Sequence, residues 1–450
     1  MRSMQLLPYK QQVSSLLRLG LPIVVGQLGM IILGLADTIM IGHHSTEEMA
    51  AAAFVNNVFN LAIIFATGFS YGLTPLIGML QGGGNTQGIG RVFRNALAAN
   101  ASVAVLLTAV MYTVYCFVDK LGQPEELLPH IRPYFVLQLI SLLFIMLFNG
   151  FRQFAEGLTD TRTPMWILLG GNALNIFGNY LLIYGSFGFP EWGLFGAGVS
   201  TLVSRIVMLL VFIGVVAVAR RYKVYREAIL RSRFNRNDFM QLNALGWPIA
   251  LQMGMETAAF SLSAIMVGWL GSIPLAAHQI MISVSTIGFM VYYGMGAALA
   301  VRVSHFMGQK DFPNLRRAVN SGMGIILSLA IVASLFFYLA RTPIIYSFTE
   351  DHEVMIVVSS LIFSLIVYQF GDALQITFAN ALRGTTDVKP MMWIAFFSYF
   401  IVALPVGYLC GFTWGGGVVG VWVAFPAGLF TAGFLFWLRF RYRLQQLMKK

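Results

Sequence analysis

The sequence predicts an all-α integral membrane protein with twelve transmembrane helices in two six-helix bundles, related by a parallel pseudo-two-fold repeat. Composition predicts the membrane. Of 450 residues, 58% are hydrophobic and only 10% are charged, and the mean hydropathy is +0.74. So few charged side chains cannot cover a water-soluble surface. The number of long apolar runs and the landmarks shared by the two halves predict the remaining features.

The apolar runs give the helices. A spanning helix needs roughly 20 predominantly apolar residues. Runs of this kind, separated by charged or Gly- and Pro-rich breaks, occur at 16–42, 50–77, 92–118, 132–155, 164–185, 193–219, 242–270, 275–301, 317–340, 354–382, 390–411 and 417–438. The polar opening MRSMQLLPYKQQ lacks a small-residue cleavage site, so we expect the first run to remain as a span and expect no soluble domain.

Lys and Arg predict the orientation. With the N-terminus in the cytoplasm, the inner segments collect nearly all of these residues, including the basic run 220–236, and the outer segments keep only Lys120, Arg132 and Arg341. We therefore expect both termini in the cytoplasm. The net charge of +11 is spread over every inner loop, which favours the lipid bilayer over a nucleic acid as the partner.

The two halves repeat. LGLPI (19–23) matches LGWPI (245–249), and the same shift aligns Gly42 with Gly268, Gly82 with Gly308, and Arg91 with Arg317. After a one-residue slip, EGLTDTRTPM (156–165) matches RGTTDVKPM (383–391). We expect an N-terminal bundle at 1–219, a basic cytoplasmic linker at 220–241 and a C-terminal bundle at 242–450. Six helices per half give both halves the same orientation, which is typical of alternating-access transporters, although duplicated bundles also occur in channels and membrane enzymes.

Three acidic residues lie inside the predicted spans: Asp37, Glu256 and Asp372. Each costs at least about 2.5–3.5 kcal/mol near the bilayer centre, so each needs a reason. An ion pair with Arg205, read as the one basic residue inside a span, could neutralise one of them but not three. We therefore interpret them as cation or proton sites and as candidate Na⁺ ligands.

Polar neighbours accompany two of these acids. Asn175 and Asn179 lie one turn apart, and Thr201 lies on the next helix, so amide and hydroxyl oxygens could join Asp37 around a hard cation. The alternative is that they form interhelical hydrogen bonds. Tyr368 precedes Asp372 by one turn, where its ring could face an organic cation or simply pack.

A larger set of residues could line a substrate cavity. The 23 Met residues and the 14% aromatic content suit an adaptable wall, although the same residue types fill any membrane bundle. The residues that we single out are Tyr292, Tyr293, Gln252 and Gln279. No GxxxxGK[ST], HExxH or CxxC pattern occurs, so we expect no ATP, no cofactor and no enzyme.

Over 16–443 the chain resembles the multidrug and toxic compound extrusion (MATE) family, whose superfamily also holds lipid-linked oligosaccharide flippases. The resemblance rests on the Pro22, Asp37 and Gly42 pattern, the QGGGN turn at Gln81, the GQKD turn at Gly308, and the paired GLTDTRTP and GTTDVKP loops. Within the family the chain is similar to the NorM branch, whose acids match Asp37, Glu256 and Asp372 and whose aromatic residue matches Tyr368. The DinF-like branch usually carries an aspartate where this chain has Asn179, and it lacks the Glu256 acid.

The resemblance implies function. It implies export of amphipathic, often cationic drugs and dyes in exchange for inward Na⁺ or H⁺, in a monomer in the bacterial inner membrane. The alternative within the superfamily is a flippase of lipid-linked oligosaccharides or lipid headgroups. The residues expected to bind the cation or proton are Asp37, Asn175, Asn179, Thr201, Glu256 and Asp372. The residues expected to line the substrate cavity are Tyr368, Tyr292, Tyr293, Gln252 and Gln279.

Overall fold

The computed structural model describes residues 6–449, and the regular elements of this part of the chain are all helices. Among these residues, twelve helical segments are long and apolar enough to cross a membrane, and each overlaps one of the predicted runs. The predicted fold class is therefore confirmed. Six of the twelve segments extend beyond their apolar runs at both ends, and the longest, α10 (Ser272–Gln309), has 38 residues.

The chain divides into two compact units. The N-unit is Val25–Ala250, and the C-unit combines the residues up to Val24 with those from Leu251 onward. Within the N-unit lie α2 (Thr46–Ser70), α3 (Leu73–Gly82), α4 (Thr86–Cys116), η1 (Val118–Lys120), η2 (Glu125–Leu127), α5 (Leu128–Gly157), α6 (Arg162–Ile183), η3 (Ser186–Gly188), α7 (Gly193–Val218), η4 (Arg220–Tyr222) and α8 (Lys223–Arg231). Within the C-unit lie α10, α11 (Phe312–Leu339), α12 (Arg341–Phe348), α13 (His352–Gly384), α14 (Lys389–Phe396), α15 (Leu404–Tyr408), α16 (Gly417–Trp422) and α17 (Ala424–Met448), with π-helical segments η5 (Phe397–Ala403) and η6 (Leu409–Thr413).

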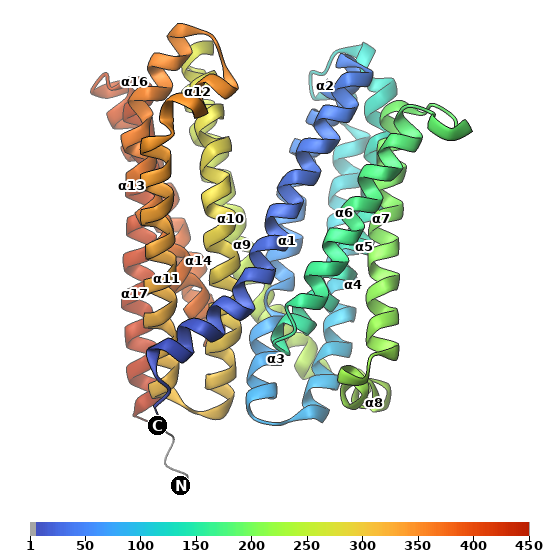
Figure 1. Cartoon of the computed structure of the whole chain (residues 1–450), viewed down its shortest axis with the longest axis vertical. Helices are drawn as coiled ribbons and strands as arrows, with labels where there is room; N and C mark the ends of the chain where they lie inside the picture. Colours follow the sequence, from blue (N-terminus) through green and yellow to red (C-terminus); the bar gives the residue numbers. More distant parts are fainter. Residues whose placement is uncertain (1–5, 450) are drawn as a thin grey trace. The chain divides into compact units, whose positions relative to one another are not determined.

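One long helix forms the centre of each unit. In the N-unit α5 packs against α2, α4 and α7, and in the C-unit α13 packs against α10, α11 and α17 (Figure 1). Both central helices become almost fully buried toward their C-terminal ends, where polar and charged side chains such as Glu156 and Arg383 are enclosed.

Two helices cross the unit boundaries. Both α1 (Tyr9–His44) and α9 (Arg236–Gly268) are continuous, so the boundaries fall inside these helices and not at 219 and 242 as expected from the sequence. Glycines allow close packing of their first halves. A Cβ on Gly20 would lie 2.4 Å from the Met295 sulfur, and a Cβ on Gly246 would lie 2.6 Å from the Phe69 ring. Each sequence repeat therefore contributes half a helix to the other unit.

The repeated loops have the same backbone conformation. Thr159 and Thr386 have φ of 66° and 59°, an uncommon left-handed conformation for a β-branched residue. The next residue closes the turn in both loops: Asp160 N donates to Ala155 O at 2.9 Å, and Asp387 N donates to Leu382 O at 3.0 Å. The repeat read from the sequence therefore extends to individual backbone hydrogen bonds.

The two loop aspartates hold different neighbours. Asp160 Oδ2 accepts hydrogen bonds from the Tyr222 hydroxyl at 2.7 Å and from Arg221 Nη1 at 2.8 Å. Burial, together with the hydrogen bond to Asp160, raises the pKa of Tyr222 above its usual value, so its hydroxyl remains a donor at neutral pH. Asp387 instead forms a two-point pair with Arg439, at 2.7 and 3.0 Å.

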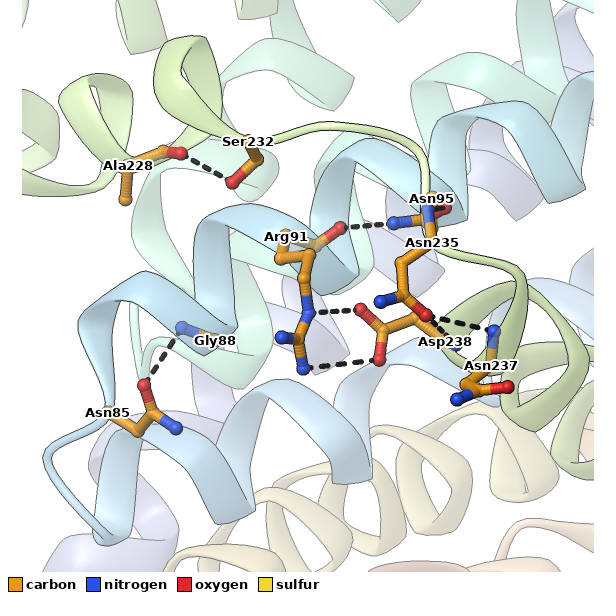
Figure 2. Close-up of polar contacts among 9 residues, drawn as sticks. All are labelled: Asn85, Gly88, Arg91, Asn95, Ala228, Ser232, Asn235, Asn237 and Asp238. Atoms are coloured by element: carbon orange, nitrogen blue, oxygen red, sulfur yellow. Dashed lines mark hydrogen bonds and ion pairs between the residues drawn. The ribbon is translucent and has the colours of Figure 1, made fainter.

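The basic linker is attached to the start of α4 (Figure 2). Arg91 Nε donates to Asp238 Oδ2 at 2.5 Å, and Asn95 Oδ1 accepts from the Asn235 backbone N–H at 2.9 Å. A Cβ on Gly90 would lie 2.4 Å from the Ala228 backbone, so α8 packs directly on α4. The linker is therefore an ordered part of the N-unit.

The segment GFSYG (68–72) matches the G-x-S-x-G pattern of serine hydrolases, and the interpretation that the chain lacks this pattern is therefore wrong. That pattern indicates a nucleophile only where a strand turns sharply into a helix. Here it lies between two helices, and Ser70 is buried, with its hydroxyl bonded to Ala66 O at 3.0 Å and Asn100 Oδ1 at 2.6 Å. It is a packing residue.

Candidate cation and substrate sites

Asp37 lies in a polar cluster inside the N-unit. Asn179 Nδ2 donates to Asp37 Oδ1 at 2.6 Å, and Asn175 Nδ2 lies 3.1 Å from Thr201 Oγ1. With the Asn175 amide turned by 180°, its nitrogen donates to Asp37 Oδ1 at 3.0 Å and its oxygen accepts from Thr201. Asp37, Asn175, Asn179 and Thr201 therefore lie together, and they combine carboxylate, amide and hydroxyl oxygens, which hard cations prefer.

Arg205 makes no ion pair with Asp37. Its Nη1 donates to Gln138 Oε1 at 3.1 Å and to the Ser141 hydroxyl, both on α5. Among residues 6–449, Asp37 is bonded only to neutral amides. The alternative in which Arg205 permanently neutralises this acid is therefore wrong for the conformation described.

Glu256 and Asp372 lie in the C-unit. Glu256 Oε2 accepts from Gln252 Nε2 at 3.0 Å and from Gln375 Nε2 at 3.1 Å. Gln252 Oε1 in turn accepts from Arg383 Nη2 at 2.8 Å, which fixes the orientation of that amide. Glu256 is thus held by two N–H donors and a chain of hydrogen bonds that ends at a guanidinium group.

Asp372 is in a very different environment. Its exposure is 0%, and neither carboxylate oxygen accepts a hydrogen bond from any described residue. Glu256 is near enough to interact with it electrostatically. An isolated buried carboxylate is costly unless a proton or a cation neutralises it. This side chain is therefore suited to exchanging one positive partner for another.

Aromatic residues lie beside Glu256 and Asp372, the two acids of the C-unit. The Tyr368 ring meets Phe260 of α9 edge-on at 6.3 Å and Phe425 of α17 at 6.5 Å, and Phe260 stacks on Phe425 at 4.7 Å. The Tyr292 hydroxyl donates to Gln369 Oε1 at 2.8 Å, which ties α10 to α13. These buried rings provide an apolar wall beside the acids of the C-unit.

The remaining two lining candidates lie elsewhere. Tyr293 is buried, with its ring tilted against Phe289 at 5.5 Å. Gln279 is exposed, and its backbone carbonyl accepts from the Ser283 hydroxyl, but its side chain bonds to none of the acids. The structure therefore brings Gln252, Tyr368 and Tyr292 toward the acids of the C-unit and leaves Gln279 apart.

Some polar residues of the site escaped the sequence analysis. Gln369 and Gln375 lie three residues before and after Asp372, a one-turn spacing that could have revealed them. Arg205 is also not the only basic residue within a span. Arg152 lies within the predicted run 132–155, and Arg302 and Arg383 lie where α10 and α13 extend beyond their runs. Arg152 forms a buried ion pair with Glu156 at 2.7 Å.

The candidate Na⁺ ligands form no compact metal site by themselves. Within residues 6–449, no group of three or more His, Cys, Asp or Glu side chains could hold a metal ion. Any cation at Asp37 would therefore use the amide and hydroxyl oxygens of Asn175, Asn179 and Thr201. This donor set, with one carboxylate, fits a monovalent cation better than a divalent one.

Twelve apolar helices arranged as a sequence repeat, with carboxylates enclosed inside both units, define a multi-pass membrane transport protein and not an enzyme. The family model MatE matches residues 22–181 and again 248–409. The chain belongs to this family, whose members are transporters. The two matched segments coincide with the two repeats, one in each half of the sequence.

Relatives are similar over nearly the whole length. The multidrug resistance protein NorM of Photobacterium profundum is 30% identical over 448 residues, covering 96% of each chain. A mutant of the Vibrio cholerae MATE transporter VcmN has a TM-score of 0.88 at 18% identity, covering 98% of this chain and 99% of that one. The eukaryotic MATE transporter AtDTX14 has a TM-score of 0.86 at 16% identity, with 98% and 99% coverage. The resemblance stated from motifs is confirmed at the level of the family.

Proposed function

We propose that this protein is a multidrug efflux antiporter that exports amphipathic organic cations in exchange for inward Na⁺ or H⁺. The observation that carries the proposal is Asp372, a fully buried carboxylate with no hydrogen-bond donor, beside Glu256, which has two. The name of the NorM relative supports a drug substrate. The aromatic wall of Tyr368 and Phe260 supports an apolar, cationic one.

The exchange follows from competition for one charge. A carboxylate at low dielectric needs a positive partner, and a proton, Na⁺ or an organic cation each supplies it. Binding of one partner then disfavours binding of the others, which is the reciprocity that antiport requires. Facing outward, the site takes Na⁺ or H⁺ and releases the drug, and facing inward it does the reverse.

The membrane potential can drive this cycle only if net charge moves. One elementary charge across 100 mV is worth about 2.3 kcal/mol, and one-for-one exchange of monovalent cations would cancel it. Acids in both units allow more than one inward cation per drug, with Asp37 as a further site. We place the protein in the bacterial inner membrane as a monomer, with both termini in the cytoplasm.

The test uses purified protein in proteoliposomes that contain a fluorescent organic cation. We expect an imposed Na⁺ or pH gradient to drive its movement, and comparison of the two gradients identifies the coupling ion. Glu256→Gln and Asp372→Asn should each reduce gradient-driven transport by at least about tenfold, because each removes a charge inside a span that the cations share. Glu227→Gln, at an exposed position on α8, is the matched control.

If Glu256→Gln and Asp372→Asn both transport normally, the assignment of the two C-unit acids as cation sites is refuted. Asp37→Asn tests the N-unit in the same assay, and we expect it to lose transport while the protein still inserts and purifies normally. A current that ignores any drug gradient would instead indicate a channel.

A further inference from the structure

The exposed side of α8 has no part in the exchange mechanism above. Figure 1 shows α8 across the lower end of α7, a membrane-spanning helix that ends at Val218. Val218 is 81% exposed, and Arg226 of α8 donates through Nη1 to the carbonyl oxygen of Ala217 in the last turn of α7. Because one side chain connects α8 to the end of a span, α8 lies at the level of the lipid headgroups, on the cytoplasmic side in the orientation proposed above.

One side of α8 is packed on the rest of the N-unit. The Tyr225 hydroxyl donates to Gln81 Oε1 at 2.8 Å, and the Tyr225 ring meets Phe154 edge-on at 6.3 Å. The Ala228 backbone lies against Gly90 of α4, where an added Cβ would be 2.4 Å away. These contacts fix the rotation of α8 about its axis, so the residues on its opposite side point away from the protein.

The opposite side combines basic and apolar residues. Leu230 is 74% exposed, and Phe234, just beyond the helix, is 61% exposed. Segment 220–236 holds seven basic residues and one acid, the exposed Glu227. Among the described residues, only Arg221 of these seven forms an ion pair with an acid. The exposed residues of the surface are Lys223, Val224, Leu230, Arg231, Arg233 and Phe234.

Water and hydrocarbon would each satisfy only part of this surface. In water the apolar side chains stay hydrated, and in hydrocarbon the charges are costly. At the bilayer surface the apolar side chains reach the start of the acyl chains while the cations remain among the headgroups. A cluster of Lys and Arg directly beside a span also attracts negative headgroups, by about fivefold for each basic residue.

We propose that α8 and the residues after it, 223–234, form a docking surface for anionic phospholipids of the adjacent leaflet. Leu230 and Phe234 insert between the lipids, and Lys223, Arg231 and Arg233 bind the phosphate groups. None of these side chains contacts the acids of the exchange mechanism, so the surface is independent of the proposed function.

The test identifies which lipid lies beside residue 230. In a background with Cys116→Ala and Cys410→Ala, Leu230→Cys carries the fluorophore NBD. The protein is reconstituted in phosphatidylcholine with a minor fraction of phosphatidylglycerol. A nitroxide, which quenches NBD at short range, is placed near the start of the acyl chain, either on the phosphatidylglycerol or on an equal amount of phosphatidylcholine. The ratio of the two quenching values measures the local preference for the anionic lipid.

We expect a ratio of at least about five at residue 230, as even one unpaired cation near the surface would confer. Arg231→Gln should lower it by up to about fivefold, and joint replacement of Lys223, Arg231 and Arg233 by Gln should bring it to about one. Arg316→Gln removes an exposed cation from α11 and should leave it unchanged. NBD at Val332→Cys, an exposed position within the span α11, is the positional control and should give about one.

Two results would overturn the proposal. A ratio near one at residue 230, or a ratio that Arg231→Gln and Arg316→Gln leave equally high, would mean that the basic residues of α8 are only solvated. Absence of quenching by either lipid would mean that α8 faces water or a soluble acidic partner. Should the triple variant fail to fold, added salt provides the same test on the original surface, because screening must lower a ratio that depends on charge. A ratio unaffected by salt refutes the proposal equally.

Discussion

The attachment of the linker at Asp160 can be tested by proteolysis. In Asp160→Asn the side chain keeps its shape but loses its charge, and the amide nitrogen replaces one acceptor oxygen. The affected donors are Tyr222, which is buried, Arg221, whose side chain is 58% exposed, and the Thr163 hydroxyl, at 2.7 Å. We expect η4, which carries Tyr222, to detach more often from the loop at 159–160.

The magnitude follows from these contacts. A hydrogen bond to a charged group contributes about 1.5–3 kcal/mol, and a charged partner makes it about twice as strong as a neutral one. The exposed Arg221 pair adds little, because ion pairs at the surface contribute about 0–1 kcal/mol. The loss is therefore about 1–2 kcal/mol of local stability, which corresponds to a rise of about 5- to 30-fold in the open population.

Limited digestion with trypsin, resolved by mass spectrometry, measures that population when reclosing is faster than cleavage. Cleavage after Arg220, Arg221 and Lys223 should accelerate about 5- to 30-fold. Cleavage after Arg233 should not, since the Arg91–Asp238 attachment is untouched. Asp387→Asn, at the equivalent loop of the second repeat, should leave all linker cleavage rates unchanged. Equal rates in Asp160→Asn and wild type would refute the reasoning.

Three further substitutions test the hydrogen bond to Glu256, the close packing at Gly246 and the buried ion pair of Arg152. Gln375→Leu removes one N–H donor from Glu256 and should lower transport kcat/KM about tenfold. Gln279→Leu is the control and should have no effect. Equal activities of the two variants in a dye-transport assay would contradict the role of Gln375. Gly246→Ala overpacks against Phe69 and should destabilise the protein by about 1–3 kcal/mol. Gly170→Ala, with nothing within 4 Å of the added Cβ, should stabilise it by up to about 1 kcal/mol. Thermal unfolding should show the two melting temperatures moving in opposite directions, and a shift of the same sign in both would be evidence against the close packing. Arg152→Gln leaves Glu156 enclosed without its ion pair and should cost about 3–5 kcal/mol, so a melting temperature near that of the wild type would mean that the pair is not buried.

The sequence predicted the helices because their apolar length reports directly on bilayer thickness. It also predicted the Asp37 cluster, since one-turn spacing places Asn175 and Asn179 on one face. It could not predict that α1 and α9 divide between units, because that depends on contacts far along the chain, such as those of Gly20 and Gly246.

The sequence also did not predict the hydrogen-bond partners around Glu256. Arg383 lies in a stretch that reads as a loop, yet α13 continues through it and buries it against Gln252. The bond from Gln375 to Glu256 depends on the packing of α9 on α13, which periodicity does not encode, whereas Gln252 lies one turn before Glu256 on the same helix. Residue identity thus indicated where charge is enclosed, but not which groups hold it.

The exchange of half-helices has a consequence for folding and ancestry. Cutting the gene within the linker would yield two polypeptides, and each would lack a segment that its own bundle requires, because the segment before Val24 belongs to one bundle and that from 236 to Ala250 to the other. Such fragments are complementary and would have to be made together. An unduplicated precursor with this arrangement would have been a swapped homodimer, whose covalent fusion fixed an exchange that was previously intermolecular.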